Sequence, residues 1–210
     1  MSSAYPQYAM TTTIIFDLGA VLIDWNPRLM YRTLFDDEAK MEKFLAEITT
    51  SDWNEEQDAG RSLQEGTEIL VGQFPEHEHL IRAFYGRWDE MLGEAFHDTV
   101  TIFKKLKESG RYKIYGLTNW SAETFPVAQA RFEFLNWFDG IVVSGEEKMR
   151  KPTPDFYHIL LNRYEVNAQE CLFIDDNYRN ILAAEKIGIA SIHFTSAEAL
   201  EEELGKRGVL

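Results

Sequence analysis

The sequence predicts an α/β fold with a doubly wound parallel sheet of about five strands and helices on both faces. Three observations support this prediction. Short apolar runs rich in β-branched residues alternate with segments of helical period in the second half of the chain. A long helical block separates the first such run from the others. Four of the runs lead into polar or charged residues, and parallel α/β sheets carry their sites at those strand ends.

The first strand is predicted by an apolar run that starts at Thr12 and stops at the carboxylate of Asp17. Aspartate is a poor strand residue and is costly to bury without a partner. It is therefore either a turn former or a functional group. Turn former is the commoner interpretation for a lone aspartate, but the ends of the later strands favour a functional group here.

A helical block follows, from about residue 28 to residue 92, with apolar residues at every third or fourth position and no expected strand. Residues 24–27 are predicted to form a loop into this block, with Pro27 in the first helical turn. Interruptions at Gly60, Gly66, Gly72 and Gly93 predict about four short helices. Because the block is too long for a simple crossover, we expect a helical domain over residues 25–93, inserted into a core of residues 12–24 and 94–210.

The second half of the chain alternates between helices and strands, which predicts parallel pairing. A break in the helix after the second strand is expected near Pro126. The predicted strands cover residues 113–117, 140–144, 172–175 and 191–194, and the predicted helices cover residues 99–108, 121–134, 154–164, 177–186 and 196–206.

The bulk composition, with 45% hydrophobic and 27% charged residues over 210 positions, is that of an ordinary globular protein. No apolar run approaches the roughly 18 residues that a membrane span needs. Residues 1–11 lack the features of a secretory signal and are predicted to be a flexible tail, so a cytoplasmic location is expected. The single cysteine, Cys171, lies in an apolar run and is predicted to be packed rather than reactive.

The net charge of −14 argues against nucleic acid or an anionic membrane as a partner, because it repels polyanions at long range. A small phosphorylated substrate stays compatible with this charge if cations are concentrated at the site. A monomer is the expected state.

The residues that follow four predicted strands form a set with a common chemistry. A carboxylate is a weak nucleophile, so its attack on a phosphoryl group requires that the charge on the target be neutralised. Mg²⁺ would do this, since it prefers carboxylate oxygens and substrate phosphate as ligands. The set therefore predicts displacement at phosphorus through an aspartyl intermediate. In chain order its members are Asp17 and Gly19, Thr118 and Asn119, Lys151, and Asp175 and Asp176.

Other interpretations of these residues exist. Thr118 and Asn119 can serve as caps of the next helix. Lys151 can be one of many solvated lysines, with Lys148 its nearest rival for a functional role. Asp175 and Asp176 can cap a helix, although a cap needs only one of them. We favour a functional role for Lys151, where it would offset negative charge, and for the Thr118 hydroxyl, where it would hold phosphoryl oxygens.

In this order, the motifs resemble those of the haloacid dehalogenase-like hydrolase superfamily, over roughly residues 12–200. The resemblance implies a Rossmann-like core, an inserted four-helix cap that closes over the substrate, and Mg²⁺ as cofactor. It also implies metal ligation by the Asp17 side chain, the Gly19 carbonyl and Asp176, with Asp175 as a further or alternating ligand and Asn180 orienting them. The matching segments are residues 16–21, residues 117–119, Lys151 with Pro152, and residues 173–177 with Asn180.

Gly19 departs from the pattern, because most phosphatases of this superfamily carry an aspartate there that protonates the leaving group. Such help is typically worth about a hundred- to ten-thousand-fold in rate. Asp24, or a water held by the cap, is a candidate substitute. One branch of the superfamily has glycine at this position and resembles phosphatases that act on glucose 1-phosphate. The segments around Asp17 and Asp175 in this chain resemble that branch, so a sugar phosphate is the expected substrate.

Two alternatives remain open at this point. One is a metal-independent 2-haloacid dehalogenase, which has no use for the acidic pair Asp175 and Asp176. The other is a catalytically silent module that binds phosphate or protein.

Further side chains are candidates for the pocket or for a second metal site. Trp25 and Trp120 follow site segments and are candidates for the pocket wall. Arg61 is a cation of the helical block that would reach phosphate or sugar. His77 and His79 have the spacing of a metal pair, but an acidic loop is the favoured explanation.

Overall fold

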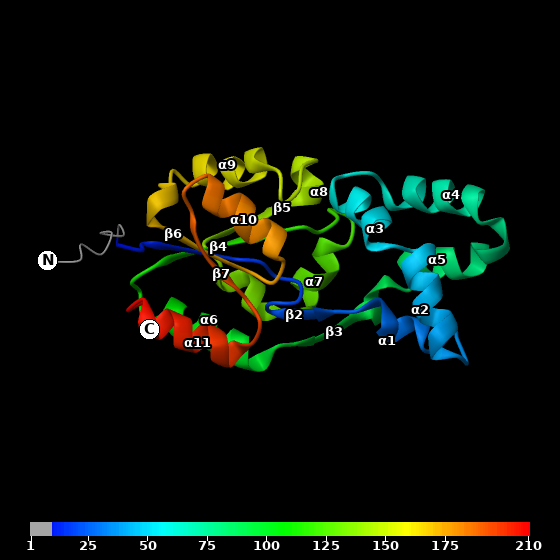
Figure 1. The fold of residues 1–210 in the computed structure, drawn as a ribbon, viewed down its shortest axis with the longest axis horizontal. Coiled ribbons are helices and arrows are strands. Elements are labelled where there is room, and N and C mark those ends of the chain that lie inside the picture. The colour runs from blue at the N-terminus through cyan, green and yellow to red at the C-terminus, as the bar shows by residue number, and fades with distance from the viewer. Residues whose placement is uncertain (1–9) are drawn as a thin grey trace, which may run out of the picture.

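The computed structural model describes residues 10–210, so most of the predicted tail, residues 1–9, lies outside the described residues. A five-stranded parallel sheet forms the centre of the molecule, and helices cover both of its faces (Figure 1). Its strand order is β5-β4-β1-β6-β7, so the order reverses beside β1, as a doubly wound sheet requires. The predicted fold class is therefore confirmed. The strands are β1 (Thr13–Phe16), β4 (Lys113–Thr118), β5 (Gly140–Val143), β6 (Cys171–Asp175) and β7 (Ala190–His193).

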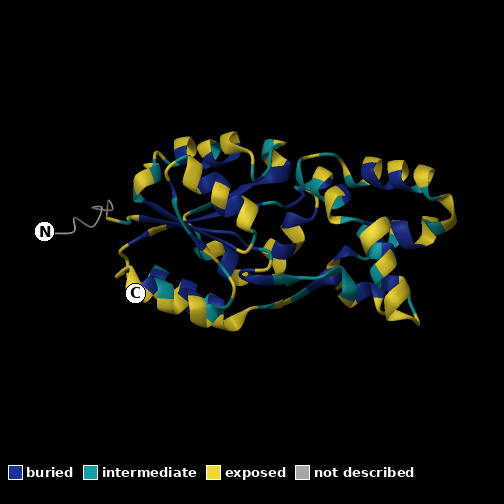
Figure 2. Cartoon of the chain, viewed as in Figure 1, coloured by how far each residue is buried: buried dark blue, intermediate teal, exposed yellow. Residues whose placement is uncertain are grey.

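Alternating side chains of β1 point to opposite faces of the sheet, and each face packs into its own hydrophobic cluster. Ile14 and Phe16 pack into the larger cluster with Phe103, while Ile15 packs into the other with Phe156. All of these side chains are at least 99% buried. A strand that is buried on both faces gains from an unbroken apolar run, which is the pattern that the sequence shows. The burial map in Figure 2 shows the sheet as the most continuously buried part of the chain.

The helices of the core agree with the predicted ones to within a few residues, with two exceptions. The short helix α8 was not predicted, and it begins at Ser144, which was expected to end a strand. Residues 121–124 are not helical, and α7 begins at Phe125 with Pro126 in its first turn instead of at a break. Proline suits that position because the first-turn N–H has no partner within the helix. The core helices are α6 (His97–Glu108), α7 (Phe125–Arg131), α8 (Ser144–Glu147), α9 (Pro154–Arg163), α10 (Tyr178–Lys186) and α11 (Ala197–Lys206), with 3₁₀-helices at Glu133–Trp137 and Ala168–Glu170.

The segment from residue 27 to residue 91, here called the helical insert, lies beyond one end of the sheet (Figure 1). It contains five α-helices and two 3₁₀-helices where about four helices were expected. Helix α4 runs through Gly66 and Gly72, which were expected to interrupt it. A Cβ atom on Gly66 would lie 2.4 Å from Oε1 of Gln57, so this glycine lets α3 and α4 pack closely. The elements are α1 (Pro27–Tyr31), α2 (Glu38–Glu47), α3 (Ser51–Asp58), α4 (Leu63–Gln73), Pro75–His77, α5 (Glu78–Gly86) and Trp88–Met91.

The chain enters and leaves the helical insert through an antiparallel pair of strands, β2 (Ile23–Trp25) and β3 (Leu92–Ala95), here called the crossing ribbon. The predicted loop at residues 24–25 is therefore wrong, and β3 was not predicted. Each strand is short, and its partner is distant in sequence, so local periodicity does not reveal the pairing. The expected domain boundaries, at residues 25 and 93, both fall within this ribbon.

Two smaller predictions concern burial and membranes. Cys171 is 1% exposed, and burial raises the pKa of its thiol to about 12, so this cysteine is packed as expected. Within the described part of the chain, no helix has both the length and the apolar character to cross a membrane.

Candidate active site

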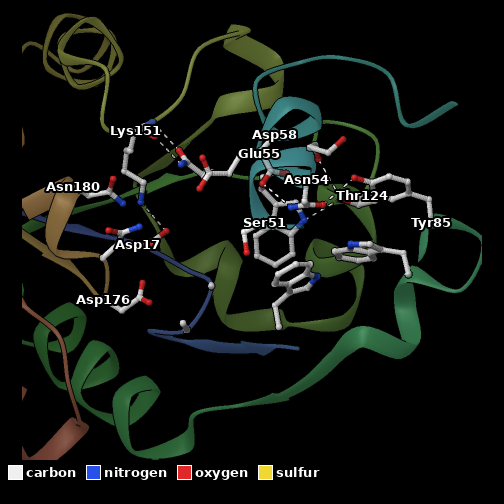
Figure 3. A pocket seen from close by; sticks show the side chains of 18 residues that line it. Asp17, Ser51, Asn54, Glu55, Asp58, Tyr85, Thr124, Lys151, Asp176 and Asn180 are labelled. Carbon is white, nitrogen blue, oxygen red and sulfur yellow. Dashed lines mark hydrogen bonds and ion pairs between the residues drawn. The ribbon is translucent and has the colours of Figure 1, made fainter. Parts of the chain in front are cut away.

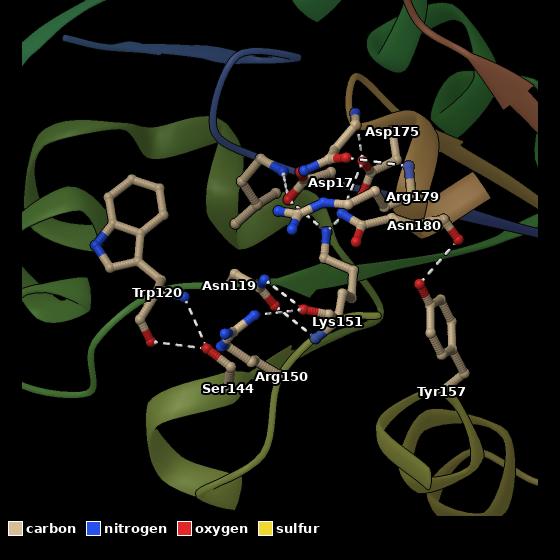
Figure 4. A network of polar contacts seen from close by, with 12 residues as sticks. Asp17, Asn119, Trp120, Ser144, Arg150, Lys151, Tyr157, Asp175, Arg179 and Asn180 are labelled. Carbon is tan, nitrogen blue, oxygen red and sulfur yellow. Dashed lines mark hydrogen bonds and ion pairs between the residues drawn. The ribbon is translucent and has the colours of Figure 1, made fainter. Parts of the chain in front are cut away.

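The carboxyl ends of β1, β4 and β6 bring the predicted site residues together (Figure 4). Asp17 directly follows β1, Thr118 ends β4, and Asp175 ends β6. The register pairs Phe16 with Gly116 on one side and with Ile174 on the other, which places the three strand ends at one level. Parallel pairing therefore brings Asp17, Thr118 and Asp175 together, and the loops that follow the strands add Asn119, Lys151 and Asp176.

Lys151 lies between two carboxylates in the interior of the protein. Its Nζ is 2.9 Å from Oδ1 of Asp17 and 2.6 Å from Oδ2 of Asp175, and the residue is 1% exposed. Burial alone would lower the pKa of Lys151, but the charges of Asp17 and Asp175 outweigh burial and raise it above its ordinary value. Lys151, and not its rival Lys148, is thus the cation in contact with Asp17.

Asn119 holds the backbone of Lys151 in place. The Asn119 side chain donates to the Lys151 carbonyl at 3.0 Å and accepts from the Lys151 N–H at 2.8 Å. Both of its polar atoms are used in this way, so Asn119 positions the lysine. Next to it, the fully buried hydroxyl of Thr118 has no hydrogen-bond partner among residues 10–210. A buried hydroxyl without a partner is available to a ligand oxygen.

Asp175 and Asp176 differ in their surroundings. Asp175 is fully buried, and both of its oxygens are engaged, by Lys151, by the Asn180 amide at 3.0 Å, and by the Asn177 N–H at 2.7 Å. Asp176 instead lines the pocket in front of Asp17. The charge of Asp175 therefore acts mainly on Lys151, while Asp176 offers free oxygens.

The carboxylates have the chemistry of a cation site. Oxygens of Asp17, Asp175 and Asp176 all lie within 4.8 Å of one another. Burial raises the pKa of Asp17 to about 8, with Lys151 opposing and the two other aspartates adding to the rise. Burial and the charge of Asp175 also raise the pKa of Asp176. A divalent cation would remove this repulsion, so the donor set fits Mg²⁺. Gly19 also lines the pocket, and a Cβ on it would meet nothing within 4 Å.

A pocket of about 230 Å³ opens in front of Asp17, between the sheet and the helical insert (Figure 3). Core residues form one part of its wall, and residues of α3 and α5 form the other. Both candidate tryptophans, Trp25 and Trp120, line it, together with Trp88. The insert contributes Ser51, Asn54, Glu55, Asp58 and Tyr85.

Several other candidates lie elsewhere. Asp24 lines a neighbouring cavity and packs against Gly93, outside the wall of this pocket. Arg61 donates to the Gln57 side chain at 2.6 Å and does not line the pocket. His77 packs against Phe44, with ring centroids 5.7 Å apart, and is not part of the acidic group.

Glu55 links the helical insert to the core at the pocket wall. Its carboxylate contacts Arg150 at 2.8 Å and Arg179 at 3.1 Å, and both arginines belong to the core. Neither arginine lines the pocket, whereas Lys151 does, so the two arginines tie α3 to the core and Lys151 brings positive charge to the pocket wall.

Sequence reasoning missed the pocket residues of α3 and α5. Asn54, Glu55 and Asp58 lie on a helix whose polar residues look like an ordinary solvated face in the sequence. Only the position of the helical block, directly after the first strand, indicated that it would border the site.

The comparisons agree with this geometry. The family profile described as haloacid dehalogenase-like hydrolase matches residues 11–188. The chain therefore belongs to the haloacid dehalogenase-like hydrolases, and it is a hydrolase, as the motifs predicted. A relative, the sesquiterpene phosphatase astK of Aspergillus oryzae, is 31% identical over 195 residues, which cover 90% of this chain and 93% of that protein. The drimenol cyclase drtB of Aspergillus calidoustus is 24% identical, over 93% of this chain but only 36% of its own length.

Solved structures share the fold. A HAD family enzyme from Bacteroides thetaiotaomicron has a TM-score of 0.67 at 20% identity, covering 89% of this chain and 95% of that one. The same enzyme has also been solved as a magnesium complex, with a TM-score of 0.67 at 21% identity, covering 89% of this chain and 94% of that one. The L-2-haloacid dehalogenase of Xanthobacter autotrophicus has a TM-score of 0.62 at 18% identity, covering 96% and 85%. At these identities the likeness concerns the fold alone.

Proposed function

We propose that this protein is a Mg²⁺-dependent phosphatase that hydrolyses a small phosphorylated metabolite through an aspartyl-phosphate on Asp17. One observation carries the proposal: a strand-end carboxylate in contact with a buried lysine, with Asp176 facing the same pocket. Membership of the hydrolase family supports it. So do the names of relatives, which include a sesquiterpene phosphatase and several phosphoglycolate phosphatases.

Mg²⁺ would be held by the Asp17 side chain, the Gly19 carbonyl and Asp176. When bound, it would neutralise phosphoryl oxygens and favour the ionised form of Asp17. Asp175 is close enough to take part, but its engaged oxygens suit it better to fixing Lys151.

The chain's own residues would act on the phosphoryl group from several sides. An Asp17 oxygen attacks phosphorus, and the bond from phosphorus to the leaving oxygen breaks. Lys151 offsets the negative charge on Asp17 and on the phosphoryl oxygens, and the unpartnered Thr118 hydroxyl donates to one of those oxygens. Water then attacks the aspartyl-phosphate, which releases inorganic phosphate and restores Asp17.

No side chain at position 19 can protonate the leaving oxygen, and Asp24 lines a different cavity. The proton would then come from water. We therefore expect a strong preference for esters whose leaving group needs no proton, such as p-nitrophenyl phosphate.

Two substrate classes are proposed. A sugar phosphate follows from the resemblance to phosphatases with glycine at position 19, and the Ser51 side chain on the pocket wall can bind a sugar hydroxyl. The aromatic side chains Trp25, Trp88 and Trp120 favour the second class, the phosphate of an apolar alcohol. The relative named as a sesquiterpene phosphatase supports this second class.

The test is phosphate release from a panel of both classes and p-nitrophenyl phosphate, with Mg²⁺ and with EDTA. Asp17→Asn is expected to abolish release, since the amide is no nucleophile, while Asp52→Asn, an exposed residue on α3, serves as control. An unchanged rate in Asp17→Asn contradicts the proposal. Chloride release from 2-chloropropionate that survives EDTA would instead identify a dehalogenase. Binding of Mg²⁺ and phosphate without turnover of any ester would identify a silent binding module.

A further inference from the structure

The pocket has two chemically different ends. Figure 3 shows Asp17, Lys151 and Asp176 grouped at one end, and Asp58 and Tyr85 at the other. A phosphoryl group on Asp17 would therefore direct its leaving group toward Asp58. The reaction proposed above assigns Asp58 no step, so the role of Asp58 is a separate question.

Asp58 is held by a chain of neutral hydrogen bonds within the helical insert. Gln57 donates to the Tyr85 hydroxyl at 2.9 Å, and Tyr85 donates to Oδ1 of Asn54 at 2.9 Å. The Asn54 amide in turn donates to Oδ2 of Asp58 at 3.1 Å. This chain fixes the Asp58 carboxylate and uses both polar atoms of the Asn54 side chain. It leaves Asp58 with free acceptor capacity toward the pocket.

The carboxylate of Asp58 forms no ion pair within the described part of the chain, in contrast to Glu55 with its two arginines. Burial and the charge of Glu55 raise the pKa of Asp58 to about 7, while the Ser121 N–H and Arg150 lower it. A partly buried acid without a cation costs more to keep ionised than one in water, unless a ligand supplies the missing partner.

Aromatic side chains line the same pocket. Trp88 and Trp120 meet at an angle of 60°, with centroids 5.8 Å apart, and each is 6% exposed. Trp120 also donates from its indole to the Thr124 hydroxyl at 3.1 Å, which fixes its ring. Aromatic faces beside an unpaired carboxylate attract an apolar group that carries a hydrogen-bond donor, and an ammonium group most strongly.

We propose that Asp58 is a specificity-determining residue, which binds an ammonium or hydroxyl group at the far end of an otherwise apolar leaving alcohol. This inference rests on the proposed phosphatase activity, and it narrows the substrate to alcohol phosphates with a distal donor. A plain sugar phosphate lacks the apolar spacer, and a plain hydrocarbon alcohol lacks the donor.

A purely structural role for Asp58 makes a different prediction. In that case the residue would only fix α3 against the segment at Ser121, and its substitution would lower stability or all activities together. Selectivity between two esters that differ only in the distal group would then stay the same.

The experiment compares kcat/KM for hexyl phosphate, 6-hydroxyhexyl phosphate and 6-aminohexyl phosphate in the Mg²⁺-loaded protein. We expect the donor-bearing esters to be preferred by about tenfold or more, with the ammonium ester first, as a hydrogen bond to a charged group allows. In Asp58→Asn, the ratio of kcat/KM for 6-aminohexyl phosphate to kcat/KM for hexyl phosphate is expected to fall close to one. Glu56→Gln, an exposed change on the same helix, is expected to leave it intact.

A binding measurement separates this inference from the proposed reaction. Asp17→Asn and the double variant Asp17→Asn, Asp58→Asn are titrated with the same esters by calorimetry, where turnover plays no part. Tighter binding of the ammonium ester that disappears in the double variant supports the role of Asp58, even if no ester is hydrolysed. Equal affinities for the three esters, or a preference that survives Asp58→Asn, overturn it.

Discussion

The two ends of the pocket are built in different ways. At the core end, Asp17, Lys151 and Asp175 form a buried set of charges, placed by the register of a parallel sheet. At the insert end, Asp58 and Tyr85 lie on short helices and are held by neutral hydrogen bonds. For the proposed activity we expect two separate roles: the sheet would fix the reacting groups, and the helices of the insert would select the leaving group.

The energetics of the two ends differ as well. Lys151 pairs with the buried carboxyl groups of Asp17 and Asp175, so its removal leaves both groups without their cation in the interior. Asp58 has no such partner within residues 10–210, so its substitution leaves no buried cation unpaired. Changes at the core end are therefore expected to affect folding and chemistry together, and changes at the insert end mainly selectivity.

The largest effect is expected from Lys151→Met, which tests whether the charges at the core end of the pocket support both folding and chemistry. This variant is expected to lose phosphatase activity about a thousandfold or more and to lose about 3–5 kcal/mol in its free energy of unfolding, because two buried carboxylates lose their cation. Denaturant unfolding and phosphate release check both effects. Lys148→Met is the matched control. A Lys151→Met variant as stable and active as the parent would mean that the ion triad is not important.

Gly19→Asp tests the core end by adding a functional group instead of removing one. The new side chain meets no atom within 4 Å of its Cβ, and it would supply the missing acid. We expect kcat/KM for unactivated alkyl phosphates to rise by about a hundredfold, while p-nitrophenyl phosphate gains little, since its leaving group needs no proton. An equal change for both esters would show that proton supply does not limit turnover.

Metal binding is expected to depend on pH through Asp17. Its pKa is raised from 3.8 to about 8, so the metal-free folded protein holds a proton that the unfolded chain has lost. Stability of the metal-free protein thus falls as pH rises through that window. Because Mg²⁺ competes with the proton, saturating Mg²⁺ should raise Tm by about 5 °C more at about pH 8.5 than at about pH 6. Differential scanning fluorimetry measures this, and an equal shift at both pH values would contradict it.

The smallest effect is expected where the two ends meet, at Glu55. Its pairs with Arg150 and Arg179 are partly exposed, so Glu55→Gln should cost less than about 1 kcal/mol of stability. We expect faster hydrogen exchange in α3, because the insert loses its ionic contact with the core. Exchange mass spectrometry tests this against Glu56→Gln. Unchanged exchange would show that packing and the other hydrogen bonds, such as the one from the Leu63 N–H to Glu123, hold the insert without the ion pairs.

The core end could be predicted from the sequence because each of its strand ends is marked by neighbouring residues in the chain. A β-branched run that ends on Asp17, and a second that ends on Asp175, identify strand ends, and parallel topology brings these ends together. The same reasoning failed for the crossing ribbon, whose strands find each other across the whole helical insert. It also failed for Arg61 and Asp58, because whether a helical side chain faces a pocket or a neighbouring helix depends on packing between helices.

The crossing ribbon has a consequence for how proteins of this design can change. Trp25 pairs with Leu92, and the Asn26 N–H donates to the Met91 carbonyl at 2.9 Å, so the two ends of the helical insert are neighbours. A segment with adjacent ends can be exchanged for another of any length without moving the strands on either side. We therefore expect the insert to be replaceable, and grafting a different segment between residues 26 and 91 is expected to change the substrates that the proposed nucleophile, Asp17, can reach.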